Sequence, residues 1–397
     1  MKFVYLDNNA TTRIDPEVLE EMLPFLRDRY GNPSSMYDFG GSIAHDIEKA
    51  RMRVAQLIGA ESEYEIVFTS GGTESDNMAI MGTLSYYRDR KHVITSSVEH
   101  PAVLNLCRRL EREGYRITFV PVDAQGALDI EFLKGAVDND TAIVSVMYAN
   151  NETGVIFPIA EIGAFLRERG VPFHVDGVQA MGKIPVDVTK LHCDLFSLSG
   201  HKFHSPKGIG ALYVRRGTRM RPILSGGHQE KGRRPGTENV PGIVGIGKAA
   251  ELAQLSLTTE EDRIRKMRDR LEGSILERCA NAMLHGDVGK RVPNTTNIGF
   301  QYVEGEAILL YLNERHIAAS SGSACSSGSL EPSHVLRAMG VPFTTAHGSI
   351  RFSLSRFTTD DDIDYTLEMV PEIIDRLLEI SPFWDSEKQE GRMPVEG

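Results

Sequence analysis

The sequence predicts an α/β protein with a larger, mainly parallel-sheet domain and a smaller α+β domain. Strand-like and helix-like segments alternate from about residue 16 to residue 253, the pattern of a parallel sheet covered by helices. Further strand and helix patterns follow beyond residue 257. The 397-residue chain is 41% hydrophobic, so it can bury a large core, and its length suits two or three domains.

Two short apolar segments of the predicted sheet lead to polar residues of complementary chemistry. Residues 171–176 finish at Asp176, and residues 194–199 lead into Lys202. Because ligands of open α/β sheets gather at the carboxyl ends of the strands, we expect both side chains to face one crevice. Pyridoxal requires an amine for a Schiff base and a carboxylate that keeps its pyridine nitrogen protonated. The alternative is two ordinary strand ends with a surface lysine.

A third strand ends in a glycine-rich turn. Residues 66–70 form a short apolar run that continues through Gly72 and Thr73 into a helix expected from Ser75. Glycines let the backbone approach an anion, and a helix N-terminus presents free N–H groups. This turn is therefore a candidate phosphate cradle, to which Thr73 adds a hydroxyl.

Three histidines lie near these segments. His100 follows the strand at residues 92–97 and could lie flat on a cofactor ring, although a single histidine is more often structural. The spacing of His201 and His204 could suggest a metal pair. Since no acidic residue or cysteine is close in sequence and Lys202 lies between them, we predict no metal site.

The four cysteines are far apart and form no Cys-x-x-Cys pair, which disfavours a zinc site and a disulfide framework. Cys107 and Cys279 lie in helical patterns and Cys193 precedes a buried strand, so packing explains them. Cys325 differs, because residues 320–329 are mostly small and predict an accessible loop with an available thiol. The alternative is a flexible linker with an incidental cysteine.

A second domain is expected after residue 257. Residues 258–261 form a Thr-x-x-Glu capping box before the charged residues 262–278, which predicts that a long helix connecting the domains starts there. Strands are expected near residues 296–300 and 349–354, and a helix near 360–380. The predicted division is a large cofactor-binding domain at residues 16–257, a small domain at 1–15 and 258–380 that carries the Cys325 loop, and a polar tail at 381–397.

Composition excludes several classes of protein. The formal net charge of −11 argues against a nucleic-acid binder, because phosphate contacts need clustered lysine and arginine. The N-terminus meets Asp7 after a short nonpolar run, so it lacks a signal-peptide core. No stretch of 18 apolar residues occurs, which argues against a membrane span. We therefore expect a cytoplasmic protein.

Several sequence blocks together resemble the cysteine desulfurase family of the NifS/IscS type, and most closely its nitrogen-fixation branch. The resemblance implies a fold-type I, aspartate aminotransferase-like enzyme that uses pyridoxal 5'-phosphate. The matching blocks lie at residues 5–12, 31–35, 99–103, 149–154, 199–202, 236–239, 321–328 and 350–355.

The resemblance also assigns roles to residues. Lys202 would hold the cofactor and act as a base, Asp176 would face the pyridine nitrogen, and Cys325 would be the nucleophile. His100 would stack on the ring, and we hypothesise that it also takes the proton of an incoming thiol. Further cofactor contacts are expected from Gly72, Thr73, Asn151, Gln179, Ser199, His201 and, in the neighbouring subunit of a homodimer, Thr237.

Arg351 is the expected clamp for the substrate carboxylate, because a guanidinium presents two parallel donors to two oxygens. Arg356 has the opposite strand parity and should face elsewhere. The resemblance places Asn151 near the same carboxylate. The alternative for Asn151 is a turn residue, since the Asn-Asn-Glu-Thr-Gly run is turn-prone.

The resemblance implies removal of sulfur from L-cysteine, which yields L-alanine and a persulfide on Cys325. The expected sulfur acceptor is an iron–sulfur scaffold protein, serving nitrogenase or general cluster assembly. Two alternatives stay open. One is another fold-type I enzyme, such as an aminotransferase or a selenocysteine lyase, which would share Lys202 and Asp176. The other is a non-catalytic protein that uses the fold only to bind assembly partners.

Overall fold

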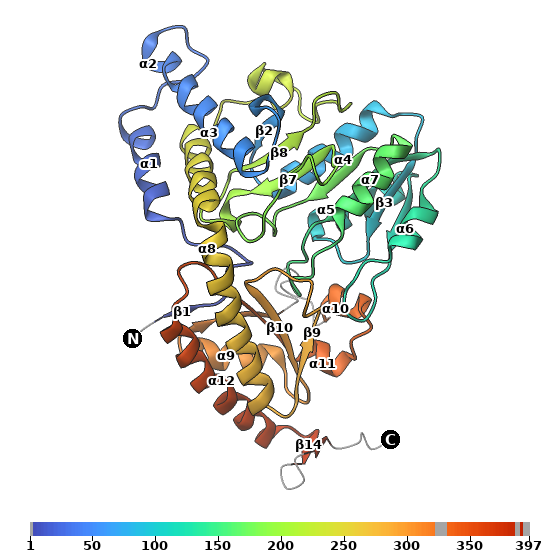
Figure 1. The fold of residues 1–397 in the computed structure, drawn as a ribbon, viewed down its shortest axis with the longest axis vertical. Helices are drawn as coiled ribbons and strands as arrows, with labels where there is room; N and C mark the ends of the chain where they lie inside the picture. Colours follow the sequence, from blue (N-terminus) through green and yellow to red (C-terminus); the bar gives the residue numbers. More distant parts are fainter. Residues whose placement is uncertain (1–2, 322–331, 386–389, 392–397) are drawn as a thin grey trace.

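The computed structural model describes residues 3–321, 332–385 and 390–391 and contains the expected layers of helices and strands (Figure 1). Among these residues the large sheet has seven strands, in the order β2-β8-β7-β6-β5-β3-β4. Only β8 runs antiparallel to its neighbours, so the prediction of a mainly parallel sheet is confirmed. The strands are β2 (Ile66–Thr69), β3 (His92–Ser96), β4 (Arg116–Val120), β5 (Thr141–Met147), β6 (Phe173–Asp176), β7 (Leu195–Ser199) and β8 (Gly210–Val214).

Helices cover both faces of this sheet, because successive side chains of each strand point to opposite faces and are buried on both. Val67 and Leu195 pack into a cluster with α4 and α5, whereas Phe68 and Phe196 pack into a second cluster with α3 and α7. The helices of the large domain are α1 (Pro16–Arg27), α2 (Asp38–Gly41), α3 (Ile43–Leu57), α4 (Gly72–Tyr86), α5 (Pro101–Arg112), α6 (Ile130–Ala136) and α7 (Ile159–Arg169).

A separate hydrophobic core forms around a second, four-stranded sheet of order β12-β13-β10-β9. Val4 and Leu6 lie in this second core, so the beginning of the chain packs with its C-terminal third, although the residue-level domain boundaries stay a prediction. The strands and helices of this domain are β1 (Val4–Tyr5), β9 (Ala282–His285), β10 (Thr295–Phe300), β11 (Ile317–Ala318), β12 (Ser320–Ser321), β13 (Ser349–Ser353), α9 (Gly305–Glu314), α10 (His334–Ala338), α11 (Phe343–His347) and α12 (Asp360–Ile380).

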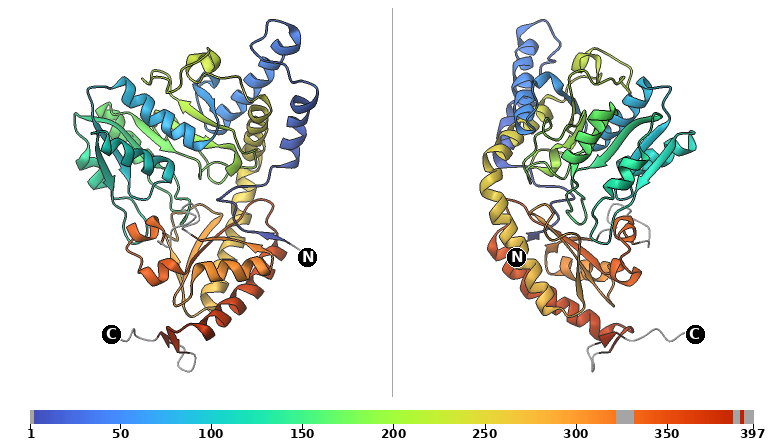
Figure 2. Two further views of the ribbon diagram at one scale, coloured as in Figure 1. Left: turned by 180° about the vertical axis from the view of Figure 1, so that it is seen from behind. Right: turned by 45° about the vertical axis from the view of Figure 1, so that its right-hand side comes forward.

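One long helix, α8 (Val240–Arg278), joins the two domains (Figure 2). The prediction that a capping box at residues 258–261 starts this helix is wrong, because α8 runs through these residues without a break. Its N-cap is Asn239, whose side chain accepts the Gly242 N–H at 3.2 Å. Glu261, the acidic residue of this pattern, instead pairs with Arg265 on the next turn, so a Thr-x-x-Glu pattern occurs here inside a helix.

The predicted polar tail at residues 381–397 contains two short strands among its described residues. Strands β14 (Trp384–Asp385) and β15 (Glu390–Gly391) pair in antiparallel fashion. The centroid of the Trp384 ring lies 5.5 Å from that of the Tyr302 ring. Residues 386–389 and 392–397 of this segment lie outside the described part of the chain. Within that part, no helix is long and apolar enough to cross a membrane.

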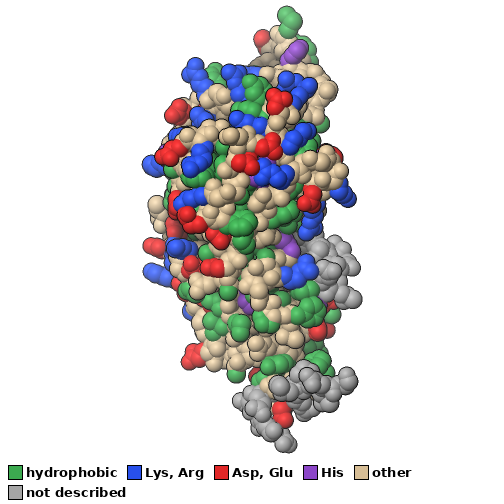
Figure 3. Space-filling view, turned by 90° about the vertical axis from the view of Figure 1, so that its right-hand side faces the viewer, with side chains coloured by type: hydrophobic (Ala, Val, Ile, Leu, Met, Phe, Trp, Pro, Cys, Tyr) green, Lys and Arg blue, Asp and Glu red, His purple; other side chains and the backbone are tan. Residues whose placement is uncertain are grey.

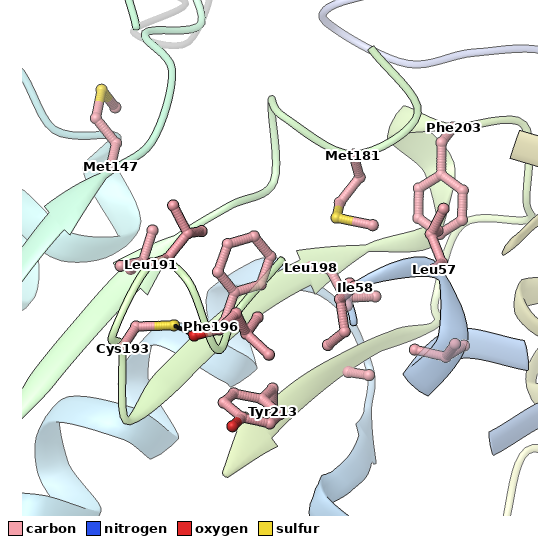
Figure 4. Close-up of a cluster of buried hydrophobic side chains, with 14 of the residues drawn as sticks. Leu57, Ile58, Met147, Met181, Leu191, Cys193, Phe196, Leu198, Phe203 and Tyr213 are labelled. Atoms are coloured by element: carbon pink, nitrogen blue, oxygen red, sulfur yellow. Dashed lines mark hydrogen bonds between the residues drawn. The ribbon is translucent and has the colours of Figure 1, made fainter. Parts of the chain in front are cut away.

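The backbone after β6 passes under an aromatic ring. Gly177 follows Asp176 directly, and an added Cβ at this position would lie 1.8 Å from Cζ of Phe196. Phe196 is fully buried in the cluster of hydrophobic side chains drawn in Figure 4. The contact presses the turn after Asp176 against the core, so a side chain at position 177 would require this ring to move.

We predict that Gly177→Ala lowers the free energy of unfolding by roughly 1–3 kcal/mol, the usual cost of overpacking, measured by urea denaturation. Adding Phe196→Leu should recover part of the loss. Gly135→Ala is the matched control, because an added Cβ there meets nothing within 4 Å, and it should leave stability unchanged or slightly higher. Wild-type stability in Gly177→Ala would contradict this account of the turn.

Candidate active site

A pocket of about 250 Å³ opens where β5, β6 and β7 end, next to the second domain. It brings together most of the residues predicted from the sequence and adds several that were not predicted. The predicted residues that line it are Gly72, Thr73, His100, Asn151, Asp176, Gln179, Ser199, His201, Lys202 and Arg351. The additional ones are Asn9, Ala10, Asp76, Met147, Ala149 and Val178.

Adjacent parallel strands deliver the carboxylate and the amine. Asp176 ends β6 and pairs in register with Ser197 of β7. Its carboxylate accepts the N–H of Val178 at 3.0 Å, which holds it at the pocket floor. Lys202 ends a short 3₁₀ turn directly after β7, and its Nζ donates to the carbonyl oxygens of Asn9 and Ala10, both at 2.7 Å. The prediction that both residues share one crevice is confirmed.

The glycine-rich turn begins α4 earlier than expected. The helix starts at Gly72, not at Ser75, so the N–H groups of its first turn belong to Gly72 and Thr73 and lie at the pocket. An added Cβ at Gly72 would lie 2.9 Å from Val178, so only glycine lets the backbone approach this closely. A 15-residue helix with free N–H groups at this end suits an anionic group such as a phosphate.

His100 caps α5 and is held in one orientation. Its Nδ1 accepts the N–H of Ala102 at 3.1 Å, which places the proton of the neutral ring on Nε2. Burial and the nearby Lys202 ammonium lower the pKa of His100 to about 4, so the ring is neutral at physiological pH. In this arrangement Nε2 is a donor. A role as thiol base stays a prediction and would require the bond to Ala102 to break.

The pocket floor contains a second acid that the sequence did not reveal. Asp76 of α4 is 1% exposed, and its Oδ1 has no hydrogen-bond partner among the described residues. Burial and the nearby Asp176 carboxylate raise the pKa of Asp76 well above its usual range. Beside it, His174 binds the Ser145 and Ser197 hydroxyls at 2.8 and 2.9 Å, and burial lowers the pKa of its ring to about 3.

Arg351 crosses from β13 of the second domain to the rim of the pocket. Its guanidinium donates to the carbonyl oxygen of Asn151 at 2.9 Å and to the Asp7 carboxylate at 2.7 Å. Nε of this buried arginine has no partner within the described part of the chain, so a donor remains for a ligand. Asn151 lies in a turn and also lines the pocket, and its contact with the substrate carboxylate stays a prediction. Arg356 pairs with Asp15 and does not line the pocket, as predicted.

Cys325 lies outside the described residues, but both segments that flank it meet the pocket region. Ser320, on β12, is the cross-strand partner of Arg351. On the far side, the Ser333 hydroxyl binds the buried Glu152 carboxylate, and His334 Nε2 lies 2.9 Å from the carbonyl oxygen of Glu99. The predictions for the other three cysteines are confirmed, since Cys107, Cys193 and Cys279 are free and buried.

Thr237 is the one predicted site residue in the described part of the chain that does not line the pocket. It is exposed on a loop whose Arg234 pairs with Glu74 of α4 at 2.8 Å. His201 lines the pocket, and its Nδ1 lies 3.2 Å from the Thr11 hydroxyl. Among the residues that the structure describes, no group of three or more acidic, histidine or cysteine side chains could hold a metal ion.

Comparisons with known proteins agree with this geometry. Residues 4–366 match the family described as Aminotransferase class-V. The chain is 58% identical over 387 residues to a cysteine desulfurase of Trichormus azollae, covering 98% of this chain and 96% of that protein. It is 53% identical over 396 residues to the cysteine desulfurase NifS of Azotobacter vinelandii, covering 100% of this chain and 97% of the relative.

A solved structure titled NifS-like protein superposes on the chain with a TM-score of 0.89 at 39% identity, covering 95% of this chain and 100% of that one. The chain therefore belongs to the class-V aminotransferase family. The family resemblance and the fold type inferred from the sequence are confirmed.

The donor set of the pocket suits pyridoxal phosphate. It offers an amine at Lys202, a carboxylate at Asp176 and helix N–H groups at Gly72, and it leaves buried polar atoms of Asp76 and Arg351 without partners in the described chain. When bound, this cofactor supplies an electron sink. Gln179 adds an amide that donates to the Asn9 carbonyl at 3.0 Å.

The affinity for pyridoxal 5'-phosphate should fall as the pH drops through the titration of Asp176. Burial raises the pKa of Asp176 to about 6, offset in part by the Val178 N–H and Lys202. The carboxylate that should face the pyridine nitrogen is therefore present above this pH and is lost below it. We expect the dissociation constant, measured by spectroscopic titration of cofactor-free protein, to rise by up to roughly tenfold per pH unit below about 6.

Asp176→Asn should bind pyridoxal 5'-phosphate weakly at every pH, and its dissociation constant should show no inflection near pH 6. His100 and His201 do not account for it, because burial and Lys202 lower the pKa of each to about 4. An inflection near pH 6 that survives in Asp176→Asn would show that another group controls binding.

Proposed function

We propose that this protein is a cysteine desulfurase that uses pyridoxal 5'-phosphate to transfer the sulfur of L-cysteine to Cys325. The observation that carries the proposal is the convergence of Lys202, Asp176 and Arg351 on one pocket, with both flanks of the Cys325 segment held beside it. Relatives at 53–58% identity over nearly the whole chain carry the name cysteine desulfurase.

The residues divide the reaction among them. Lys202 would hold the cofactor through its amine and, once that amine is released, would serve as the base for the α-proton of the substrate. Arg351 receives the substrate carboxylate, for which its Nε is available. The Cys325 thiolate attacks the substrate sulfur, so that a sulfur–sulfur bond forms while the carbon–sulfur bond breaks. The electron pair of the broken bond stays with the substrate carbon, which takes up a proton. Lys202 returns a proton to the α-carbon, and the product leaves as L-alanine.

The length of the chain allows Cys325 to reach the pocket. Ser321 ends β12, whose other residue pairs across the sheet with Arg351 at the pocket rim. Four extended residues span at most about 14 Å, so a thiol four positions after Ser321 lies within reach of a substrate bound at Arg351. The Ser333–Glu152 and His334–Glu99 contacts hold the other end of the segment to the large domain.

The decisive experiment incubates wild type and Cys325→Ala with L-cysteine and follows alanine together with protein-bound sulfur. Wild type should produce both, whereas Cys325→Ala should still change the cofactor spectrum on adding L-cysteine but not turn over. Cys279→Ala, which removes a buried thiol, is the matched control and should retain both products. Alanine production by Cys325→Ala at the wild-type rate would refute the proposal. Transamination without bound sulfur in wild type would favour the aminotransferase alternative.

Arg351→Lys should raise the KM for L-cysteine by roughly ten- to hundredfold, because the ammonium cannot reproduce a two-donor contact to a carboxylate. Arg356→Lys is the matched control, since Arg356 lies on the same chain segment but pairs with Asp15 outside the pocket. The KM of Arg356→Lys for L-cysteine should stay within about twofold of wild type, because substitutions away from the pocket have small effects. Equal effects of the two substitutions on KM would argue against Arg351 as the substrate clamp.

We further propose a homodimer in which Thr237 contacts the cofactor phosphate of the neighbouring copy. Its exposure outside the pocket of its own chain supports this assignment. The projecting α2 region adds an apolar surface that a second copy could cover, with Met36, Tyr37 and Phe39 at 102%, 61% and 48% exposure (Figures 1 and 2).

For the sulfur acceptor we propose an iron–sulfur scaffold protein, and for the location the cytoplasm. On the face drawn in Figure 3, basic and acidic side chains are interspersed. This mixture agrees with the net charge of −11 in disfavouring nucleic acid as a partner.

A further inference from the structure

Behind the pocket lies a buried lysine that the predicted chemistry does not use. Lys183 is 9% exposed and follows the turn that carries Gln179. Its Nζ donates to Oε1 of Gln179 and, at 3.1 Å, to Oδ1 of Asn9. On its other side Lys183 lines a second cavity of about 50 Å³, which Lys202 also borders. The lysine therefore lies between the candidate active site and a space large enough for a few water molecules.

These two contacts determine how the neighbouring amides are oriented. With Oε1 directed at Lys183, Gln179 presents its Nε2 to the carbonyl oxygen of Asn9 at 3.0 Å. A reversed amide would place its N–H₂ against the lysine donor. Asn9 is held similarly, because its Oδ1 accepts from Lys183 and, at 3.1 Å, from Nδ2 of Asn294, while its Nδ2 donates to the Thr295 hydroxyl at 2.8 Å.

The orientation of Asn9 matters because its carbonyl oxygen also receives the Lys202 amine at 2.7 Å. Gln179 and Lys202 thus share one acceptor, and Lys183 holds the residue that provides it. A change at Lys183 would reach the amine through this short chain of hydrogen bonds without direct contact with substrate or cofactor.

Stability does not explain a lysine here. Burial lowers the pKa of Lys183 well below its usual range, and the Lys202 and Arg351 cations lower it further. A lysine with a depressed pKa is protonated in the unfolded chain at neutral pH, so folding must remove its proton or bury its charge. The residue therefore costs stability at neutral pH, and replacing such a buried charge with an apolar side chain is often neutral or stabilising.

We propose that Lys183 is a positioning residue, which orients Gln179 and Asn9 and through the Asn9 carbonyl sets the place of the Lys202 amine. The inference rests on the proposed function only in taking Lys202 as the cofactor-bearing amine. It makes Lys183 part of the machinery that prepares the pocket for cofactor, although it touches neither the cofactor nor the substrate.

The test compares full-length wild type, Lys183→Met and Lys183→Arg. Lys183→Met should weaken pyridoxal 5'-phosphate binding by roughly ten- to hundredfold, the range for losing hydrogen bonds from a charged donor. It should also shift the pH midpoint of the bound cofactor's absorption band, while the melting temperature of cofactor-free protein stays unchanged or rises. Lys183→Arg should restore most of the affinity, because the adjacent cavity can accept the larger guanidinium.

Lys190→Met is the matched control. Lys190 is an exposed lysine of the following segment, paired with Asp187, and its loss should alter none of the three readouts. A double variant of Lys183→Met with Gln179→Leu should bind cofactor little more weakly than Gln179→Leu alone, because that variant has already lost the Lys183–Gln179 contact.

The proposal is overturned if Lys183→Met binds cofactor as wild type does. It is also overturned if the melting temperature of Lys183→Met falls in parallel with its affinity and the losses of affinity from Lys183→Met and Gln179→Leu add in the double variant. These readouts do not require turnover of L-cysteine. A wild type that binds the cofactor but releases no alanine would therefore contradict the proposed function and leave the Lys183 comparison intact.

Discussion

The Lys202 amine is placed by a peptide segment near the N-terminus, more than 190 residues earlier in the chain. Asn9 and Ala10 present their carbonyl oxygens to it, and the Asn9 backbone N–H is held in turn by the Ser353 hydroxyl of β13. The Asn9 side chain also binds Thr295 of β10. Because one residue binds both the large-domain lysine and the second sheet, the pocket forms only when the two domains pack against each other.

The same region concentrates charges that burial makes costly. Asp76, Asp176, Lys202 and Arg351 line the pocket, and the buried Lys183 lies behind it against Gln179. Like charges buried near one another raise the free energy of the folded protein unless a ligand of opposite sign enters. A binding site accepts such a cost because the stored electrostatic energy returns when cofactor and substrate bind. A core built for stability alone would contain apolar groups here.

Fold and site were predictable from the sequence to different degrees. The ends of β6 and β7 could be predicted because each is a short apolar run followed at once by a glycine or a polar residue. The start of α8 could not, since residues 258–261 carry a capping pattern in the middle of a helix. A local pattern marks a helix start only when the chain before it is not already helical, and tertiary packing of α8 decides that here.

Residues that act through long-range contacts also escaped prediction. Asn9 lies within a block that marks the family, yet nothing in the block shows that its carbonyl would face Lys202. Asp76 and Lys183 look like ordinary surface charges of a helix and a loop, and only their burial distinguishes them. Burial is a property of the packed chain, so a local sequence signal for it was missing.

The sequence alone determined the chemical groups of the site, because strand ends, a glycine turn and a loop cysteine follow from local preferences of the backbone. The tertiary structure decided which of these groups meet, that Arg351 pairs with Asp7 while its Nε stays available to a ligand, and that Asp76 and Lys183 become buried. The physical reason is that hydrogen bonds between distant segments and the loss of solvent around a charge arise only when the whole chain is packed.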